Sequence, residues 1–149
     1  FDMVVVDIPA PYYIQTGLLF TREFYAMVKD RLNPEGILSI YLCERFSPKK
    51  KKFISSRIVA AINCVFKDFF IVNSNAAGYS FLMAGDNIPF NKDKIVNAFK
   101  LSGPEDGFLV FDKKQAMSVV AGTEPASFSN LDIVLDLNLW ALPYDIEYK

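Results

Sequence analysis

The chain has 149 residues, 52% of them hydrophobic, and its 16 basic and 17 acidic residues nearly balance. This size and apolar content fit one domain with a real core, and the balanced charge argues against nucleic acid as a partner. The sequence holds no histidine, so we expect no metal site, and any catalysis has to use carboxylate, tyrosine, lysine or serine side chains.

The sequence opens on "FDMVVVD", and the β-branched run from Val4 to Val6 is typical of a parallel strand buried on both faces. Such a strand needs neighbours on both sides, so we expect the chain to begin in the middle of a larger fold. Thr21 is placed to cap a following helix that carries Glu23 in its first turn. The spacing of apolar residues predicts a core-facing stripe on that helix, made of Phe24, Met27, Val28 and Leu32.

After the helix-breaking "NPEG", residues 37–42 ("ILSIYL") read as a second strand, and the order strand, helix, strand predicts a right-handed parallel crossover. A second helix is expected from Ser47 to about Lys67. Its predicted apolar stripe consists of Ile54, Ile58, Ile62, Val65 and Phe66. Two short apolar runs, residues 69–73 and 79–84, then predict an antiparallel pair joined through residues 74–78.

Beyond Gly85 the sequence predicts two more helices, one capped by Asn91 and one capped by Asp112 and stopped at Gly122. Residues 131–140 ("LDIVLDLNLW") fit either an alternating strand or a helix. The alternation of strand and helix patterns predicts one α/β domain over residues 1–149, with parallel strands plus an antiparallel pair.

Residues 4–42 contain a set of short motifs that resemble the polyamine aminopropyltransferases, the spermidine synthase family. In that family a strand ends in D-x-x-D-P, a loop leads to L-[FY]-T-x-E-F-[FY], and a helix closes with L-x-P-x-G. The positions that match are Asp7, Pro11, Leu19, Phe20, Thr21, Glu23, Phe24, Tyr25, Leu32, Pro34 and Gly36. The resemblance covers roughly residues 1–85 and implies the C-terminal half of a Rossmann-like fold of the S-adenosylmethionine-methyltransferase type.

The family chemistry is attack by a polyamine on the methylene beside the sulfonium of decarboxylated S-adenosylmethionine. An alkylamine has a pKa near about 10 and is mostly ammonium in water, so a carboxylate has to bind the cation and accept its proton. The resemblance assigns that role to Asp7, which otherwise reads as the start of a turn before a proline. It also implies that the acceptor pocket is lined by Tyr12, Tyr13, Gln15 and Tyr79.

Two departures from the family pattern stand out. Ala10 replaces the second aspartate, which removes one anionic contact for the polyamine. No G-x-G occurs in the sequence, so the main site for decarboxylated S-adenosylmethionine is expected upstream of residue 1. We therefore expect the C-terminal part of a larger spermidine synthase-like domain, inactive alone and homo-oligomeric. The alternatives are an S-adenosylmethionine-dependent small-molecule methyltransferase and a non-catalytic remnant used for ligand sensing or assembly.

The two cysteines and the longest apolar segment indicate where in the cell the protein is expected. Cys43 and Cys64 form no C-x-x-C pair, which favours free thiols in a reducing compartment, and we expect a cytoplasmic protein. The longest apolar stretch, residues 58–72, is interrupted by Asn63, Lys67 and Asp68. A bilayer span needs about 20 consecutive apolar residues, so we expect no membrane contact.

Overall fold

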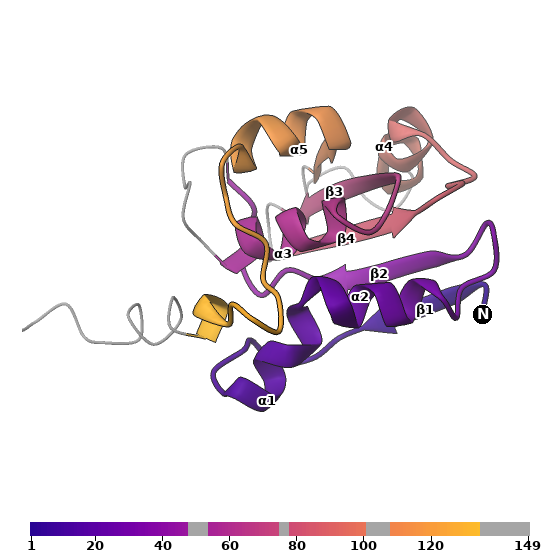
Figure 1. The fold of residues 1–149 in the computed structure, drawn as a ribbon. Helices are drawn as coiled ribbons and strands as arrows, with labels where there is room; N and C mark the ends of the chain where they lie inside the picture. Colours follow the sequence, from indigo (N-terminus) through magenta and orange to yellow (C-terminus); the bar gives the residue numbers. More distant parts are fainter. Residues whose placement is uncertain (48–53, 75–77, 101–107, 135–149) are drawn as a thin grey trace, which may run out of the picture.

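A computed structural model of the chain describes residues 1–47, 54–74, 78–100 and 108–134. Strands and short helices alternate along these residues (Figure 1). In chain order they are β1 (Met3–Val6), α1 (Ile14–Gly17), a 3₁₀ turn (Leu18–Phe20), α2 (Arg22–Lys29), β2 (Ile37–Tyr41), α3 (Ile54–Asn63), β3 (Asp68–Ser74), β4 (Ser80–Gly85), α4 (Lys92–Lys100), β5 (Phe108–Asp112) and α5 (Lys113–Val120).

The strands form one mixed sheet in the order β1-β2-β4-β3-β5. Strands β1 and β2 are parallel, with Val6 beside Ile40. Strands β3 and β4 are an antiparallel hairpin, and β4 inserts between β2 and β3. The predicted parallel and antiparallel pairs are both confirmed. Strand β5, antiparallel to β3, was not predicted from the sequence.

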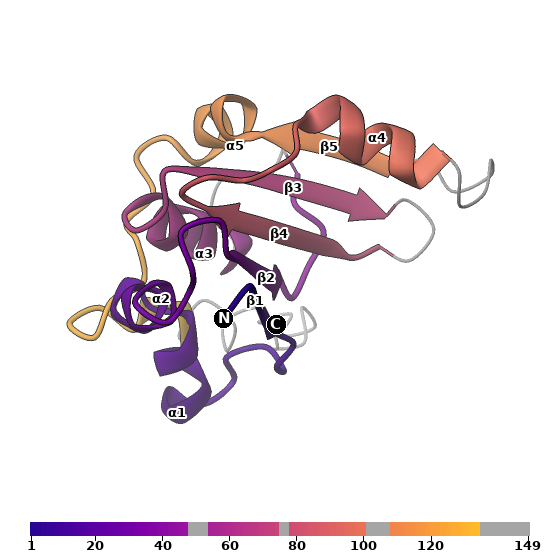
Figure 2. The same ribbon diagram turned by 90° about the vertical axis from the view of Figure 1, so that its right-hand side faces the viewer.

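Helices cover the two faces of this sheet unequally. Helices α2, α3 and α5 lie together on one face, as Figure 2 shows. Between them and the strands lies the main core, which includes the fully buried Phe20, Tyr25, Leu38, Ile40, Ile58, Ile62, Phe69, Ile71 and Leu82. On the other face, α4 covers a second cluster formed by Phe70, Val72, Ile95 and Val110. That face is open over β1 and β2, where Met3 and Val5 are 55% and 62% exposed.

Helix α2 has the predicted cap, but its buried face differs from the prediction. The Thr21 hydroxyl accepts a hydrogen bond from Phe24 N at 3.3 Å. Tyr25 is fully buried, whereas Met27 is 61% exposed and Phe24 and Val28 are only half-buried. The assignment of Met27 to the core was therefore wrong. Met27 instead lines a groove beside β1, together with Phe1, Val4 and Phe24.

Helix α3 is buried on almost every side and ends earlier than predicted. Its predicted stripe is buried at Ile54, Ile58 and Ile62. The expected start at Ser47 is not helical, and residues 48–53 lie outside the described part of the chain. The helix ends at Asn63 rather than near Lys67, because the following residues form a tighter turn in which Val65 N donates to Ile62 O at 3.0 Å.

The two later helices were predicted with their caps. Asn91 Oδ1 accepts from Lys94 N at 3.0 Å at the start of α4. Asp112 Oδ1 accepts from Gln115 N at 2.8 Å at the start of α5. Gly122, just past α5, has a φ of +77°, a left-handed conformation that glycine adopts without strain.

In the turn "NPEG" between α2 and β2, the glycine is required by close packing against the start of the chain. A Cβ added to Gly36 would stand 2.8 Å from the carbonyl oxygen of Phe1. The same turn binds the start of the chain, since Asn33 N donates to Phe1 O at 2.8 Å and Ile37 N donates to Asp2 O at 3.0 Å. A side chain at position 36 would push β1 away from β2.

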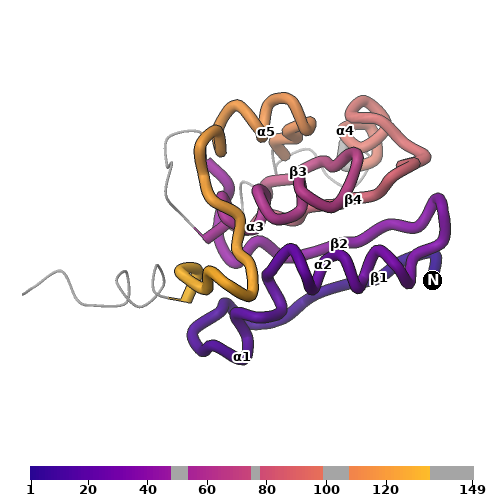
Figure 3. Tube along the Cα trace, viewed as in Figure 1, coloured from indigo at the N-terminus to yellow at the C-terminus, as the bar shows by residue number. Residues whose placement is uncertain are grey.

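A segment that we name the strap, residues 124–134, runs from the end of α5 to the vicinity of α1 and α2 (Figure 3). Arg22 N donates to Ala126 O at 3.0 Å, and Phe128 N donates to Glu23 Oε2 at 3.0 Å. Within the strap Ile133 is fully buried. Residues 132–134 form a helical turn, and the remainder of the stretch 131–140 lies outside the described residues.

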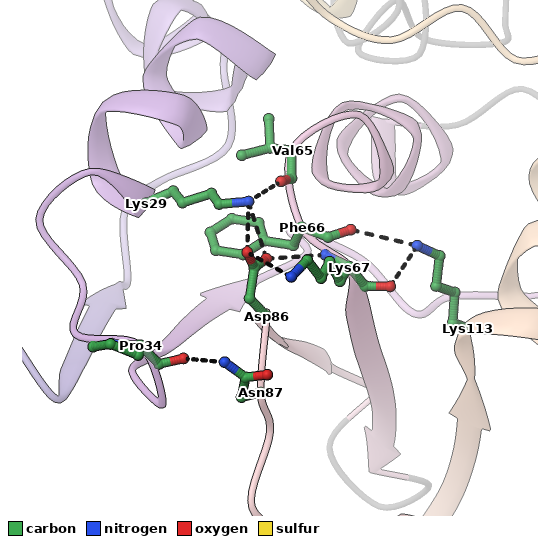
Figure 4. Close-up of polar contacts among 8 residues, drawn as sticks. All are labelled: Lys29, Pro34, Val65, Phe66, Lys67, Asp86, Asn87 and Lys113. Atoms are coloured by element: carbon green, nitrogen blue, oxygen red, sulfur yellow. Dashed lines mark hydrogen bonds and ion pairs between the residues drawn. The ribbon is translucent and has the colours of Figure 1, made fainter.

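A cluster of charged side chains ties α2 to the end of α3 and the end of β4 (Figure 4). Lys29 Nζ donates to Val65 O at 2.7 Å and pairs with Asp86 Oδ2 at 2.9 Å. Asp86 also accepts from Lys67 N at 3.2 Å. From α5, Lys113 Nζ donates to Lys67 O at 2.8 Å. Two lysines thus satisfy carbonyl groups that follow a helix C-terminus, where positive charge is favourable.

This cluster predicts a pH dependence of stability. Burial alone raises the pKa of Asp86, but the hydrogen bonds from Lys29 and Lys67 and their positive charges outweigh burial, so the pKa lies below its ordinary value. The pKa of an aspartate in the unfolded chain is about 3.9. Because the pKa of Asp86 is lower in the folded state, its carboxylate stabilises the fold fully above the unfolded pKa. This contribution is lost as the pH falls through the folded pKa. We expect the urea midpoint to drop between about pH 5 and pH 2, and Asp86→Asn to remove part of that drop.

The control is Asp93→Asn, which removes an exposed carboxylate from the first turn of α4. Among the described residues no lysine pairs with Asp93 as Lys29 pairs with Asp86, so Asp93→Asn should not remove the part of the drop that depends on the cluster. A drop of equal size in Asp86→Asn and the wild type would contradict the assigned role of the cluster.

None of the helices among the described residues is long and apolar enough to cross a membrane.

Candidate functional site

Strand register brings an acid and two aromatic rings into one row across three strands. Asp7 follows Val6, which lies beside Ile40 in the parallel pair, so Asp7 comes next to Tyr41. Tyr41 lies directly opposite Phe81 in the antiparallel pair. Side chains in register point to the same face of a sheet. The row therefore lies on the open face, at the carboxyl end of the parallel strands, where α/β sheets bind ligands.

A pocket of about 240 Å³ is lined by Asp7, Tyr41, Tyr79 and Phe81. The Tyr41 and Tyr79 rings meet edge to face, with centroids 5.6 Å apart, and the Tyr41 and Phe81 centroids are 5.8 Å apart. Aromatic faces and a carboxylate both attract an organic cation. This arrangement is suited to binding an ammonium group.

The Tyr41 hydroxyl lies among other ionisable groups at this pocket. Burial raises its pKa, and the charges of Cys43, Tyr79, Asp7 and Tyr12 raise it further. Tyr41 therefore stays a neutral phenol at physiological pH. A neutral hydroxyl can donate or accept a hydrogen bond without adding charge to the pocket.

A buried polar network holds the wall of the pocket. Asn73 Nδ2 donates to Phe46 O at 2.7 Å, and Ser80 Oγ donates to Asn73 Oδ1 at 2.6 Å. Phe46 N in turn donates to Ser80 Oγ at 2.8 Å. Both polar side chains are at most 1% exposed. The network joins the loop after β2 to the hairpin, and it thereby fixes Tyr79 beside Tyr41.

The chain turns sharply just after Tyr41. Cys43 has a φ of +63°, a conformation that non-glycine residues seldom adopt. Burial, and secondarily the charge of Glu44, raises the pKa of the Cys43 thiol to about 12, so this thiol is not a nucleophile near neutral pH. Glu44 Oε1 accepts from Ser55 N at 3.0 Å and from Ser55 Oγ at 2.8 Å at the start of α3.

The residues that sequence reasoning assigned to the acceptor pocket are distributed over two places. Asp7 and Tyr79 line one pocket together. Tyr12, Tyr13 and Gln15 line a separate groove against the strap. Their contact with a ligand stays a prediction.

Sequence reasoning missed Tyr41 and Phe81. The signal lay in the register: had Val6 been aligned with Ile40, the alternation of side chains along "ILSIYL" would have placed Tyr41 beside Asp7. Among the residues that the structure describes, no three His, Cys, Asp or Glu side chains come together as a possible metal site.

Comparison with known proteins gives a consistent picture. No family model matches the sequence. The chain is 25% identical over 84 residues to the polyamine aminopropyltransferase of Oceanobacillus iheyensis, a match over 56% of this chain and 16% of that protein. It is 26% identical over 94 residues to the polyamine aminopropyltransferase of Leptospira interrogans, a match over 62% of this chain and 19% of that protein.

Among solved structures, a probable spermidine synthase from Corynebacterium glutamicum superposes with a TM-score of 0.60 at 15% identity. The match covers 85% of this chain and 47% of that one. It confirms the predicted methyltransferase-like α/β fold. The chain thus spans about a fifth or less of the length of these curated relatives and about half of the solved neighbour. Over the part that the matches cover, the chain is similar to spermidine synthase-like proteins.

Proposed function

We propose that this chain supplies the acceptor-amine half of an aminopropyltransferase site, with Asp7 as cation anchor and proton acceptor. The observation that carries the proposal is the pocket in which the Asp7 carboxylate meets the rings of Tyr41, Tyr79 and Phe81. Two relatives named polyamine aminopropyltransferase support the reaction class.

In the proposed reaction the neutral acceptor nitrogen attacks the methylene beside the sulfonium of decarboxylated S-adenosylmethionine. A new C–N bond forms as the C–S bond breaks, and the sulfur keeps the electron pair and leaves as 5′-methylthioadenosine. The nitrogen loses its proton to the Asp7 carboxylate. The strand end holds this carboxylate in place, which favours a productive orientation.

We also propose that the aminopropyl donor binds mainly outside this chain, and that the chain completes its sheet with further parallel strands. The lack of a G-x-G turn in the sequence supports the first point. The second is supported by a groove beside the β1 edge, lined by apolar residues that include Phe1, Val4 and Phe24.

We propose that the protein resides in a reducing compartment, the cytoplasm. The free thiols of Cys43 and Cys64 support this location.

Product analysis of the complete protein tests the proposal. Incubation with decarboxylated S-adenosylmethionine and a polyamine should release 5′-methylthioadenosine in proportion to the aminopropylated amine. S-adenosylhomocysteine formed from S-adenosylmethionine would instead mark a small-molecule methyltransferase. If neither product forms, the protein is a non-catalytic module for ligand sensing or assembly. The proposal would be overturned both by S-adenosylhomocysteine formation and by the absence of both products.

Restoring the missing acid at position 10 should tighten acceptor binding. Ala10 is half-buried in the loop after Asp7, and its carbonyl accepts from Tyr12 N at 2.7 Å. A charge-assisted hydrogen bond from an ammonium to Ala10→Asp is worth about 1 to 2 kcal/mol, or roughly fivefold to thirtyfold in Kd. Isothermal titration with a diamine measures this change. Ala10→Asn is the control without charge, and equal affinities of the two variants would contradict an electrostatic role.

The exposed β1 edge should make the isolated chain associate, and we propose a homo-oligomer. Within the part of the chain that the structure describes, β1 is an edge strand paired with β2 alone, and Met3 and Val5 project from it. Such edges template further pairing. Sedimentation velocity should show association that grows with concentration and is reduced by Val5→Lys. Ala26→Lys, at an exposed position of α2, should change little. A wild-type chain that stays monomeric at high concentration would contradict this prediction.

A further inference from the structure

The loop that runs from Asp7 to the end of α1 has few anchors of its own. Within residues 7–17 only Pro11 and Gly17 are buried, and the others are exposed or half-buried. The hydrogen bonds inside the loop are local, such as the one from Gly17 N to Tyr13 O at 2.8 Å. Local bonds set the shape of a loop and not its place on the protein, so its place depends mainly on what packs against the two buried residues.

The strap packs against this loop at Gly17. A Cβ added to Gly17 would stand 2.5 Å from Val134 Cγ2 and 4.0 Å from Pro11 Cβ. The two buried residues of the loop therefore lie together, and Val134 rests on Gly17 from the side of the strap. Pro11 in turn lies only four residues after Asp7 in the sequence.

The glycine at position 17 is explained by this close approach and not by its backbone conformation. Gly17 has a φ of −58° and a ψ of −35°, in the right-handed helical region that every L-residue adopts. Alanine is normally more favourable than glycine in that region. Gly17 therefore provides the space that Val134 fills.

The strap is itself anchored to the main core. Ile133 is fully buried and belongs to that core together with Val134. Arg57 of α3 pairs with Asp132 of the strap, with Nη2 and Oδ2 3.6 Å apart. The hydrogen bonds to α2 hold the other half of the strap. The strap therefore connects the helix layer to a loop that has little support of its own.

We propose that the contact between Gly17 and Val134, which we name the joint, is a positioning device for Asp7. The inference rests on the proposed function, in which Asp7 accepts the proton. Strand β1 fixes the residue before Asp7, since Val6 is paired in the sheet, and the joint fixes the loop that follows. With both sides held, the carboxylate keeps its place in its pocket. A displacement of about 1 Å is enough to slow a reaction strongly.

The test exchanges volume across the joint in the complete protein. Gly17→Ala places a methyl group 2.5 Å from Val134 Cγ2, and Val134→Ala removes that atom, so the double variant restores the fit. Gly17→Ala should lower kcat for 5′-methylthioadenosine release about tenfold to a hundredfold. It should change the KM for the acceptor less, because the rings around the amine belong to β2 and the hairpin. The double variant should recover most of the lost kcat.

A second readout follows the loop without turnover. Chymotrypsin cleaves after aromatic residues, and Tyr12 and Tyr13 are 50% and 71% exposed. Cleavage requires local opening, so its rate follows the population of the opened loop. Gly17→Ala should speed cleavage after these tyrosines about tenfold, and the double variant should return it close to the wild-type rate.

Two further variants complete the set. Val134→Ala alone leaves a gap in the joint, so it should shift both readouts in the same direction as Gly17→Ala by a smaller amount. It keeps the proposal testable if Gly17→Ala does not fold. Val110→Ala is the matched control, since Val110 is 8% exposed against 7% for Val134 but lies in the cluster under α4. It should leave the cleavage after the two tyrosines unchanged.

The outcomes separate the two proposals. The joint is refuted if Gly17→Ala and Val134→Ala change neither readout, or if the double variant is as impaired as Gly17→Ala. Faster cleavage with unchanged kcat would show that the joint holds the loop without positioning Asp7, which overturns this inference and leaves the proposed function standing. If the wild type releases no 5′-methylthioadenosine, the proposed function fails, and the role of the joint fails with it.

Discussion

In the complete protein, Asp7→Asn is expected to lower the rate of aminopropyl transfer about 10²- to 10⁴-fold. Asparagine keeps the shape of the side chain but neither neutralises an ammonium nor accepts its proton. Asp7 is exposed and does not support the core, so the melting temperature should hardly change. The measurement is the initial rate of 5′-methylthioadenosine release at saturating donor.

A second readout of the same variant does not depend on turnover. Because the charge of Asp7 contributes to the raised pKa of Tyr41, Asp7→Asn should lower that pKa, which an ultraviolet titration of the tyrosines can follow. Asp30→Asn, an exposed aspartate at the C-terminal end of α2, serves as the control. Wild-type turnover in Asp7→Asn would refute the role of proton acceptor.

Asn73→Ala is expected to destabilise the chain by about 2 to 4 kcal/mol, because it leaves buried polar groups unsatisfied. Phe46 O loses its donor and Ser80 Oγ loses its acceptor, and both groups are buried. Urea unfolding measures the change. Because the network also fixes the hairpin that carries Tyr79, acceptor binding should weaken even at temperatures where the variant stays folded.

Asn87→Ala is the matched control for this substitution. Its amide donates to Pro34 O at 2.9 Å at an exposed site (Figure 4), where water replaces the lost partner. We expect a cost below about 1 kcal/mol. Equal costs at positions 73 and 87 would mean that the buried network contributes no more than a surface contact.

The sheet could be predicted where the chain carries its own signal. The β-branched run at Val4 to Val6 and the two apolar runs around residues 74–78 identify their strands locally, and Thr21 and Asp112 mark helix starts by capping chemistry. Strand β5 was missed although Phe108 to Phe111 form an apolar run, because a run of four residues does not by itself specify a strand. It is fixed by pairing with β3, a contact between distant segments.

The site was predictable only in part, for a similar reason. Asp7 could be named from its motif, but the aromatic partners depend on which residues lie side by side. Tyr41 and Phe81 meet through the β2–β4 pairing, which the sequence does not specify locally. Met27 was misassigned because helical periodicity reports which residues share a face and not whether a neighbour covers them.

The strap has a consequence for how the protein is made. The loop that carries Tyr12 leaves the ribosome before the strap does, and Glu23 meets its partner Phe128 only after another 105 residues have been added. Contacts of such sequence separation form late. Until then Val134 and Ile133 do not pack on Gly17, and the wall opposite Tyr12 does not exist. A nascent chain halted after α5 would hold the sheet and the Asp7 pocket, but not the wall that the strap builds opposite residues 12–15.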